Sequence, residues 1–142
     1  MIKKKIKKIL VPIDGSKSSF KGLNEAIYLA RQCGSTLTGF YVVPIYPSRF
    51  GDLLNTFKKE AFRQARKFLD EAKTISARNG IVFNGKMVYG EPKYEIIDFA
   101  HGRQFDLIVI GSHGFGPIKE MFLGSVANVV VHRSKIPVLV VK

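Results

Sequence analysis

The chain has 142 residues, 46% of them hydrophobic and 24% charged, which are the proportions of a globular protein and exclude a disordered one. Its single cysteine, Cys33, excludes an internal disulfide and is typical of a reducing compartment. The formal net charge of +12 is unusual, because a strongly basic protein attracts polyanions such as nucleic acid, acidic membrane or nucleotide.

Two segments carry much of this charge: the lysines between Lys3 and Lys8, and the stretch from Lys58 to Lys73. The chain contains no zinc-finger, RNP-type or KH-type pattern, so we favour a solvated basic surface and keep a nucleic-acid or polyanion-binding module as an alternative. No apolar run approaches the roughly 18 residues that cross a bilayer. We therefore expect a cytoplasmic protein that does not contact membrane, with its basic N-terminus leading into a strand rather than a signal peptide.

Apolar runs and helical periods alternate along the chain. Segments expected to form strands are, in order, Ile9–Ile13, Leu37–Val43, Val82–Tyr89, Leu107–Ile110 and Val138–Val141. The nearly continuous apolar runs of the first, fourth and fifth, rich in Val, Ile and Leu, are typical of strands covered on both faces. The third contains Asn84 and Gly85, so we place it at an edge of the sheet.

Between these strands, apolar residues recur every three or four positions, which predicts four helices. The first lies between a cap at Ser16 and a stop at Gly34, and the second runs from Leu54 to about Gly80. Pro92 opens the third, and Val126, Val129 and Val130 mark the fourth. The Pro44–Leu53 connection is longer than usual. Strict alternation predicts an α/β fold with a parallel sheet, formed by residues 1–142 as a single domain.

In open parallel sheets, ligands bind beyond the carboxyl ends of the strands. Asp14 follows the first strand there, and the glycine-rich stretch Ile110–Gly114 follows the fourth. Gly111 and Gly114 would let backbone N–H groups approach an anion, and the start of the fourth helix at Gly124 and Ser125 would add unpaired amides. The alternative is that these glycines only permit a tight loop and close helix–sheet packing.

Two familiar phosphate-binding patterns do not match. In a Walker A loop counted from Gly111 and Gly116, Pro117 stands where the lysine belongs. The dinucleotide pattern G-x-G-x-x-G fails after Gly116, and this loop follows the fourth strand rather than the first.

The spacing Gly-x2-Gly-x9-Gly-Ser/Thr is met by Gly111, Gly114, Gly124 and Ser125, and it resembles the signature of the universal stress proteins. The resemblance covers essentially the whole chain, including KKILVPIDGSKSS, GEPKYEIIDFA, DLIVIGSHG and GSVANVVVHRSKIPVLVV. It implies a Rossmann-like fold of the adenine nucleotide alpha hydrolase-like type. The implied sheet is open and five-stranded, in the order 3-2-1-4-5 with helices on both faces, and the last strand pairs with a second copy in a homodimer.

The resemblance also implies a nucleotide-binding, stress-related regulatory protein that holds ATP with little or no turnover; slow ATP hydrolysis is the alternative. In the ATP-binding branch, a first-strand aspartate and a second-strand valine contact the nucleoside, and the glycine loop holds the ribose and phosphates. The nucleotide-binding residues carried over to this sequence are Pro12, Ile13, Asp14, Val42, Ile110, Gly111, His113, Gly114, Gly124, Ser125 and Val126.

One stretch departs from the family pattern. After Gly114 the chain reads Phe115-Gly116-Pro117, and the proline removes one N–H that could meet a phosphate. We interpret His113 as a phosphate or ribose contact and assign no catalytic residue, because no orienting partner for a base is evident. The histidines lack the spacing of metal ligands, so we expect Mg²⁺ or Mn²⁺ to be held mainly by the phosphates.

Overall fold

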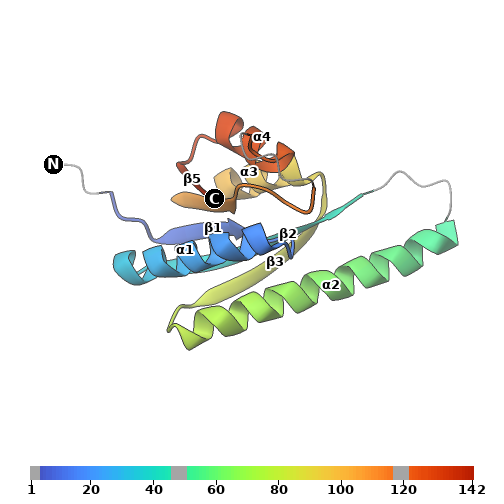
Figure 1. Cartoon of the computed structure of the whole chain (residues 1–142), viewed down its shortest axis with the longest axis horizontal. Helices are drawn as coiled ribbons and strands as arrows, with labels where there is room; N and C mark the ends of the chain where they lie inside the picture. Colours follow the sequence, from blue (N-terminus) through green and yellow to red (C-terminus); the bar gives the residue numbers. More distant parts are fainter. Residues whose placement is uncertain (1–3, 46–50, 117–121) are drawn as a thin grey trace.

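The computed structural model describes residues 4–45, 51–116 and 122–142, with the backbone alone for residues 51–55. In these residues, strands and helices alternate along the chain (Figure 1). The elements are β1 (Lys8–Pro12), α1 (Lys17–Cys33), β2 (Thr36–Pro44), α2 (Gly51–Arg78), β3 (Phe83–Gly90), α3 (Pro92–Gly102), β4 (Leu107–Gly111), α4 (Ser125–Arg133) and β5 (Val138–Val141). The expected strand and helix order is confirmed.

All neighbouring strands run parallel, in the order β3-β2-β1-β4-β5. The order 3-2-1-4-5 and the edge position of the third strand are therefore confirmed. The central strands β1 and β4 are almost fully buried, as their unbroken apolar sequences indicate. They are the two neighbours whose crossover connections leave in opposite directions, which opens a crevice at their carboxyl ends.

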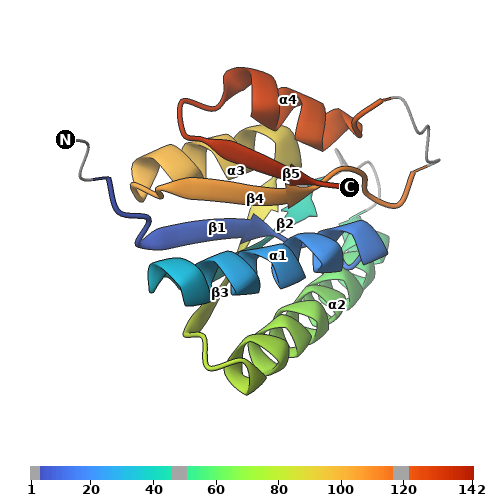
Figure 2. The ribbon, with the colours of Figure 1, turned by 60° about the vertical axis from the view of Figure 1, so that its left-hand side comes forward.

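Helices cover both faces of the sheet (Figure 2). On one face, α1 and α2 bury Leu23, Ile27 and Leu69 against strand residues such as Ile9 and Val109. On the other, α3 and α4 bury a second set that contains Ile96, Ile97, Val130, Phe40 and Ile110. Each face is a separate apolar cluster, because successive residues of a strand point to opposite sides.

Local signals account for the helix ends. Ser16 caps α1 by accepting a 3.1 Å hydrogen bond from the Ser19 amide, and Gly34 ends it with a φ of 68°. A φ in this left-handed region is readily adopted by glycine, which has no Cβ. Pro92 stands in the first turn of α3, where its missing N–H costs no hydrogen bond.

Two expectations need correction. The Pro44–Leu53 connection is shorter than expected, because α2 already begins at Gly51; residues 46–50 lie outside the described residues. The β5 residues Val138–Val141 are all at least partly exposed, unlike those of the central strands. An edge strand has only one neighbour, and β5 pairs with no described strand on its outer side.

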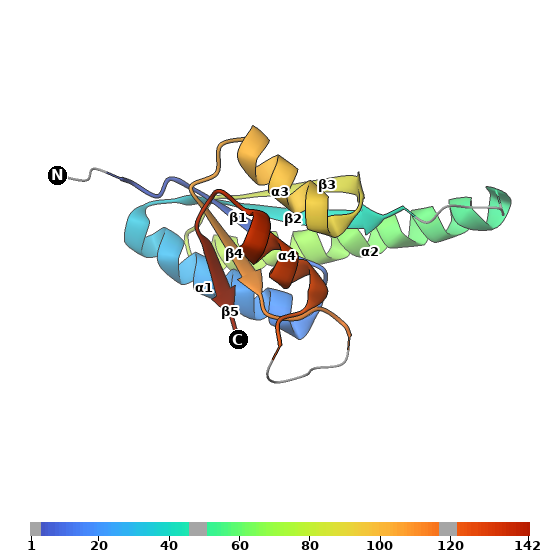
Figure 3. The same ribbon diagram turned by 90° about the horizontal axis from the view of Figure 1, so that it is seen from above.

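The 28-residue helix α2 extends well past the sheet at the carboxyl end of β2 (Figure 3). No helix in residues 4–45, 51–116 and 122–142 is both long enough and apolar enough to cross a membrane.

Candidate functional site

A cavity of about 530 Å³ opens at the carboxyl ends of β1 and β4, a size suited to a small molecule or cofactor. Its walls come from the ends of β1, β2 and β4, from α3 and α4, and from the segments that flank residues 117–121. The structure brings all the carried-over nucleotide-binding residues to this cavity: Pro12, Ile13, Asp14, Val42, Ile110, Gly111, His113, Gly114, Gly124, Ser125 and Val126.

One part of the cavity is apolar and largely buried. Phe40 and Val42 of β2 form a wall together with Ile96 of α3, Ile110 of β4 and Ala127 of α4. Phe40 is held in place from behind by Phe99, whose ring stacks on it with centroids 4.4 Å apart. Such a wall favours a flat apolar group, and an aromatic base is one.

The other part of the cavity is formed by backbone at the start of α4. Gly124 is the N-cap of this helix, and no side chain caps its first turn. The amides of the first turn have no partner within a helix, and the helix dipole adds partial positive charge there. Ser125 adds a hydroxyl beside them. This end of the cavity therefore favours an anionic group.

Not every amide in the signature is available to a ligand. The Gly124 N–H donates to the Ser112 carbonyl at 2.8 Å, and the His113 N–H donates to Ser18 Oγ at 3.2 Å. For Gly114, no described residue accepts a hydrogen bond from its N–H. The amides that could bind an anion are therefore those of Gly114 and of the first turn of α4. These are fewer than the glycine spacing in the sequence suggests.

The glycines serve different purposes. A Cβ on Gly111 would lie 2.5 Å from the Ser18 carbonyl oxygen, so this glycine allows α1 to pack closely on β4. A Cβ on Gly114 would lie 2.8 Å from Asp14 Oδ2, inside the cavity. Close helix–sheet packing, the alternative considered from sequence, thus explains Gly111, whereas the loop position next to the cavity explains Gly114.

His113 ties two segments together through its ring. Nδ1 lies 2.8 Å from Ser112 Oγ, and Nε2 lies 2.7 Å from the Phe122 carbonyl oxygen. Because a carbonyl can only accept, Nε2 carries a proton and donates it, and a neutral ring then accepts from the Ser112 hydroxyl at Nδ1. The histidine lines the cavity, but both nitrogens are already engaged within the protein.

Asp14 is the one acidic side chain among the described lining residues, which include no lysine or arginine. Its Oδ1 accepts the Ser16 N–H at 2.8 Å, and its Oδ2 faces Gly114. Its charge also reaches Tyr41, whose pKa is raised above 10.0 first by burial and second by Asp14. A polyphosphate would enter without a described basic side chain to balance its charge, so an accompanying cation would help. Within the part of the chain that the structure describes, no three His, Cys, Asp or Glu residues gather to hold a metal ion.

Sequence reasoning missed several lining residues, among them Phe40, Pro92, Ile96, Phe115 and Phe122. Phe40 could have been found, because it lies two positions before Val42 and so shares its face of the strand. The rim residues Phe115 and Phe122 are 74% and 67% exposed, and no local pattern distinguishes them from other surface aromatics. Pro117, the departure from the family pattern, lies outside the described residues.

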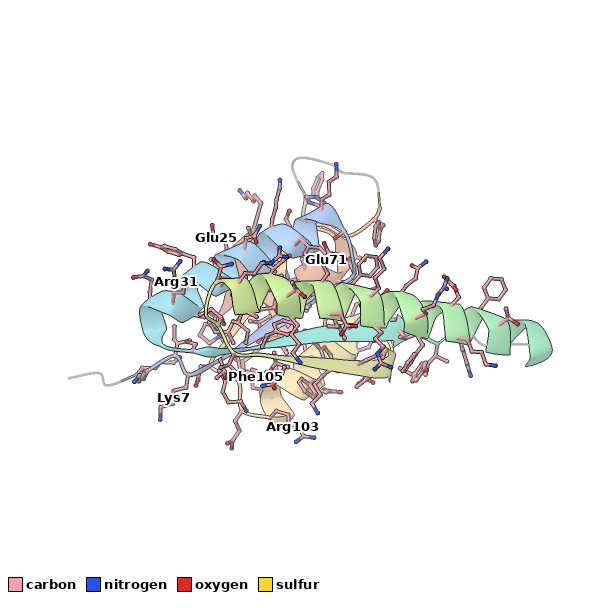
Figure 4. The ribbon with its side chains drawn as sticks, turned by 90° about the horizontal axis from the view of Figure 1, so that it is seen from below. Lys7, Glu25, Arg31, Glu71, Arg103 and Phe105 are labelled. Carbon is pink, nitrogen blue, oxygen red and sulfur yellow. The ribbon has the colours of Figure 1, made fainter. Side chains whose placement is uncertain are left out.

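The lysine-rich N-terminal segment lies at the opposite, amino end of the strands (Figure 1). There Lys7 and Arg103 lie on the same side of the molecule in Figure 4, and Lys8 Nζ lies 4.6 Å from the centroid of the buried Phe105 ring. Polyanion binding by this segment stays a prediction.

Comparison with known proteins agrees with this architecture. The model described as the universal stress protein family matches residues 5–142. Universal stress protein YxiE of Bacillus subtilis is 34% identical over 151 residues, covering 95% of this chain and 98% of that protein. Universal stress protein UspA from Lactobacillus plantarum has the same fold, with a TM-score of 0.90 and 26% identity over 98% of this chain and 99% of that one. A universal stress protein solved in complex with cAMP has a TM-score of 0.74 and 29% identity over 96% and 97% of the two chains. The chain belongs to the universal stress protein family.

Proposed function

We propose that this chain is an ATP-binding universal stress protein of the cytoplasm that acts as a nucleotide-dependent regulatory switch. The observation that carries the proposal is the cavity of about 530 Å³, which combines an apolar wall with the uncapped start of α4. The complex of a relative with cAMP supports an adenine nucleotide as the ligand class.

The two parts of the cavity support one orientation of the proposed nucleotide. The adenine base packs on the wall formed by Phe40, Val42 and Ile110. The phosphates point to Gly114 and to the first turn of α4, where free amides and the helix dipole meet them. Mg²⁺ or Mn²⁺ accompanies ATP and is held mainly by its phosphates, because Asp14 is the only nearby carboxylate among the described lining residues.

Little or no turnover follows from the state of the polar side chains. A general base needs a free nitrogen or oxygen within reach of the attacking water. Both His113 ring nitrogens are hydrogen-bonded to other parts of the chain, and Asp14 Oδ1 is bonded to the Ser16 amide. Asp14 Oδ2 has no described donor and is the one remaining candidate base, and we propose that it does not activate a nucleophile because no described side chain orients it.

Isothermal titration calorimetry on the nucleotide-stripped protein tests the proposal. ATP is compared with AMP, cAMP and GTP, each with and without Mg²⁺; we expect ATP to bind most tightly and GTP least. Failure of every adenine nucleotide to bind at millimolar concentration would refute adenine nucleotide binding, and preference for cAMP would refute ATP as the ligand. Phosphate release faster than about one per second would show an enzyme rather than a switch.

Ser125→Asp sharpens the test because it separates binding from folding. A carboxylate in the first turn of α4 interacts favourably with the partial positive charge at the helix N-terminus. The free energy of unfolding should therefore rise by about 0.3–1 kcal/mol. The same carboxylate repels the phosphates, so ATP affinity falls about tenfold. Ser125→Asn is the uncharged control, and equal affinity of the two variants would contradict phosphate binding at this end of α4.

We also propose that the chain forms a homodimer through β5. Its four residues are at least partly exposed, among them Leu139 at 38%, and its outer edge pairs with no described strand. Sedimentation velocity should show a dimer at micromolar concentration that Leu139→Lys converts to monomer. The control Tyr28→Lys changes a 60% exposed residue of α1 and should leave the dimer intact; a monomeric wild-type protein would refute the proposal.

A further inference from the structure

A second hollow lies far from the cavity, along the free edge of β3. Its volume is about 410 Å³, and it is open, lying between one side of α2 and the outermost strand. In Figure 4, which looks onto α2, β3 runs beside this helix. The edge is free because β3 pairs only with β2 in the sheet order β3-β2-β1-β4-β5.

The hydrogen-bonding pattern between β2 and β3 determines which backbone groups of β3 face the open edge. The Leu37 N–H donates to the Val82 carbonyl at 3.0 Å, and Leu37 is level with Phe83 in the parallel register. In a parallel pair, alternate residues of a strand bond to one neighbour and the residues between them face the other side. The N–H and C=O groups of Phe83, Gly85 and Met87 therefore point to the open edge, and these same residues line the groove.

The groove also presents apolar surface and positive charge. Met87 is half-buried and Phe62 is 41% exposed, with Leu69 nearly buried beneath them. Arg66 and Lys73 of α2 line the same groove, and both are exposed. Asp70 lies between them, yet the ion pair seen in the described residues is a different one, between Arg63 and Glu60. Neither Arg66 nor Lys73 thus forms an ion pair with a described carboxylate, although Asp70 lines the same groove.

The geometry points to a docking site for an extended acidic peptide segment of another protein, which adds to β3 as a sixth strand. Its backbone pairs with the outward groups of Phe83, Gly85 and Met87, which is a common mode of peptide recognition. Its carboxylates meet Arg66 and Lys73, which are seven residues or about 10 Å apart along α2. Acidic residues two or four positions apart on one face of the added strand, about 7 to 13 Å, span this distance.

Charge is the argument for an acidic partner rather than a second copy of this chain. Two copies joined edge to edge at β3 would bring two basic grooves together in a protein of net charge +12. Like charges held close in an interface are destabilising, whereas carboxylates here would find cations that have no described partner.

Fluorescence anisotropy with a labelled eight-residue peptide of alternating valine and glutamate tests the site. We expect binding in the micromolar range, and none by the matched peptide with lysine in place of glutamate. Arg66→Glu/Lys73→Glu should weaken binding at least tenfold. The control Arg63→Glu/Lys67→Glu makes the same charge change on another side of α2 and should leave binding within twofold.

A second pair of variants tests the backbone hydrogen bonding of β3 separately from the side-chain charges. Gly85→Pro removes an N–H that faces the open edge and is not used by the sheet, so peptide binding should fall at least tenfold. Gly85→Ala keeps that N–H, and its Cβ would meet the groove residue Leu69 at an ordinary 3.5 Å, so it should weaken binding far less than Gly85→Pro. Thermal unfolding of each variant shows that it is folded.

Each contrary result overturns the inference. Absence of binding by the glutamate peptide at 1 mM, or equal binding by both peptides, excludes an acidic segment. Binding that survives Gly85→Pro in a folded protein excludes strand addition. Self-association that Gly85→Pro abolishes would identify a second copy as the occupant instead.

Discussion

The two ends of the parallel sheet differ in whether their backbone amides are hydrogen-bonded within the protein. At the amino end, the Lys7 and Lys8 amides both donate to Asp106 Oδ2, at 2.9 and 3.0 Å. At the carboxyl end, no described residue accepts from the Gly114 amide, and no side chain caps α4. Because polar groups of a folded chain are normally paired, the end with unpaired amides is where we propose that the ligand binds.

The basic side chains lie away from the cavity. Lysines gather in the N-terminal segment and on α2, whereas the described lining of the cavity has Asp14 and no lysine or arginine. The net charge of +12 therefore does not locate the proposed nucleotide site. In our proposal, main-chain dipoles rather than basic side chains meet the phosphates, so the overall charge of the protein is a poor guide to this site.

The largest expected effect contrasts glycines near the two ends of β4. Gly111→Ala places a Cβ 2.5 Å from the Ser18 backbone, which must move, so the free energy of unfolding should fall by about 2–3 kcal/mol. Gly102→Ala, before the amino end of β4, meets no described atom within 4 Å and should be neutral or slightly stabilising. Urea unfolding measures both; equal stability would show that α1 does not constrain Gly111.

The next effect concerns the ligand end alone. Gly114→Ala directs a Cβ at Asp14 Oδ2, 2.8 Å away, and narrows the cavity, so ATP affinity measured by calorimetry should fall about tenfold. Gly116→Ala adds a methyl group with no described atom within 4 Å, so affinity should stay within twofold. If both variants bound ATP like the wild type, the phosphates would have to bind elsewhere than at Gly114.

At the amino end, Asp106→Ala removes the acceptor of two amides, and we expect a loss of about 1 kcal/mol at neutral pH. The hydrogen bond from the Lys7 amide, then that from Lys8, lowers the pKa of Asp106 below 3.8. Because the pKa of Asp106 is lower in the folded than in the unfolded protein, its charged form stabilises the fold at pH values above 3.8. This stabilisation is lost as the pH falls through the pKa of the folded state.

The difference in unfolding free energy between wild type and Asp106→Ala should accordingly shrink in acid. Urea unfolding at neutral pH and well below 3.8 measures it. Asp98→Ala, at an exposed position of α3, serves as the control and should change stability by less than about 0.5 kcal/mol. A difference that does not change with pH would contradict the role of the carboxylate charge.

The smallest expected effect is the influence of the Asp14 charge on the pKa of Tyr41. Asp14→Asn should lower the pKa of Tyr41, because the neighbouring negative charge helps to raise it. The pKa should remain above 10.0, since burial is the larger cause and is unchanged. NMR titration of ring-labelled tyrosine measures the shift, and Asp98→Asn should produce none.

Much of the fold could be predicted because its signals are local. The Val, Ile and Leu runs of β1 and β4, the cap at Ser16 and the stop at Gly34 each depend on residues only a few positions apart. The residues that the family resemblance implies all line the cavity, and their contact with a nucleotide stays a prediction. Phe115 and Phe122 could not be predicted, because nothing near them in sequence says which surface aromatic borders a cavity.

By itself, the sequence determined the order of strands and helices along the chain and where the glycines bring backbone within reach of a ligand. Only the tertiary structure decided which amides remain for that ligand. The His113 amide is taken by Ser18, 95 positions earlier, and the Gly124 amide by Ser112. Such pairings exist only once α1 has packed on β4 and α4 has closed over the strand end, because a hydrogen bond forms between groups that packing brings within about 3 Å.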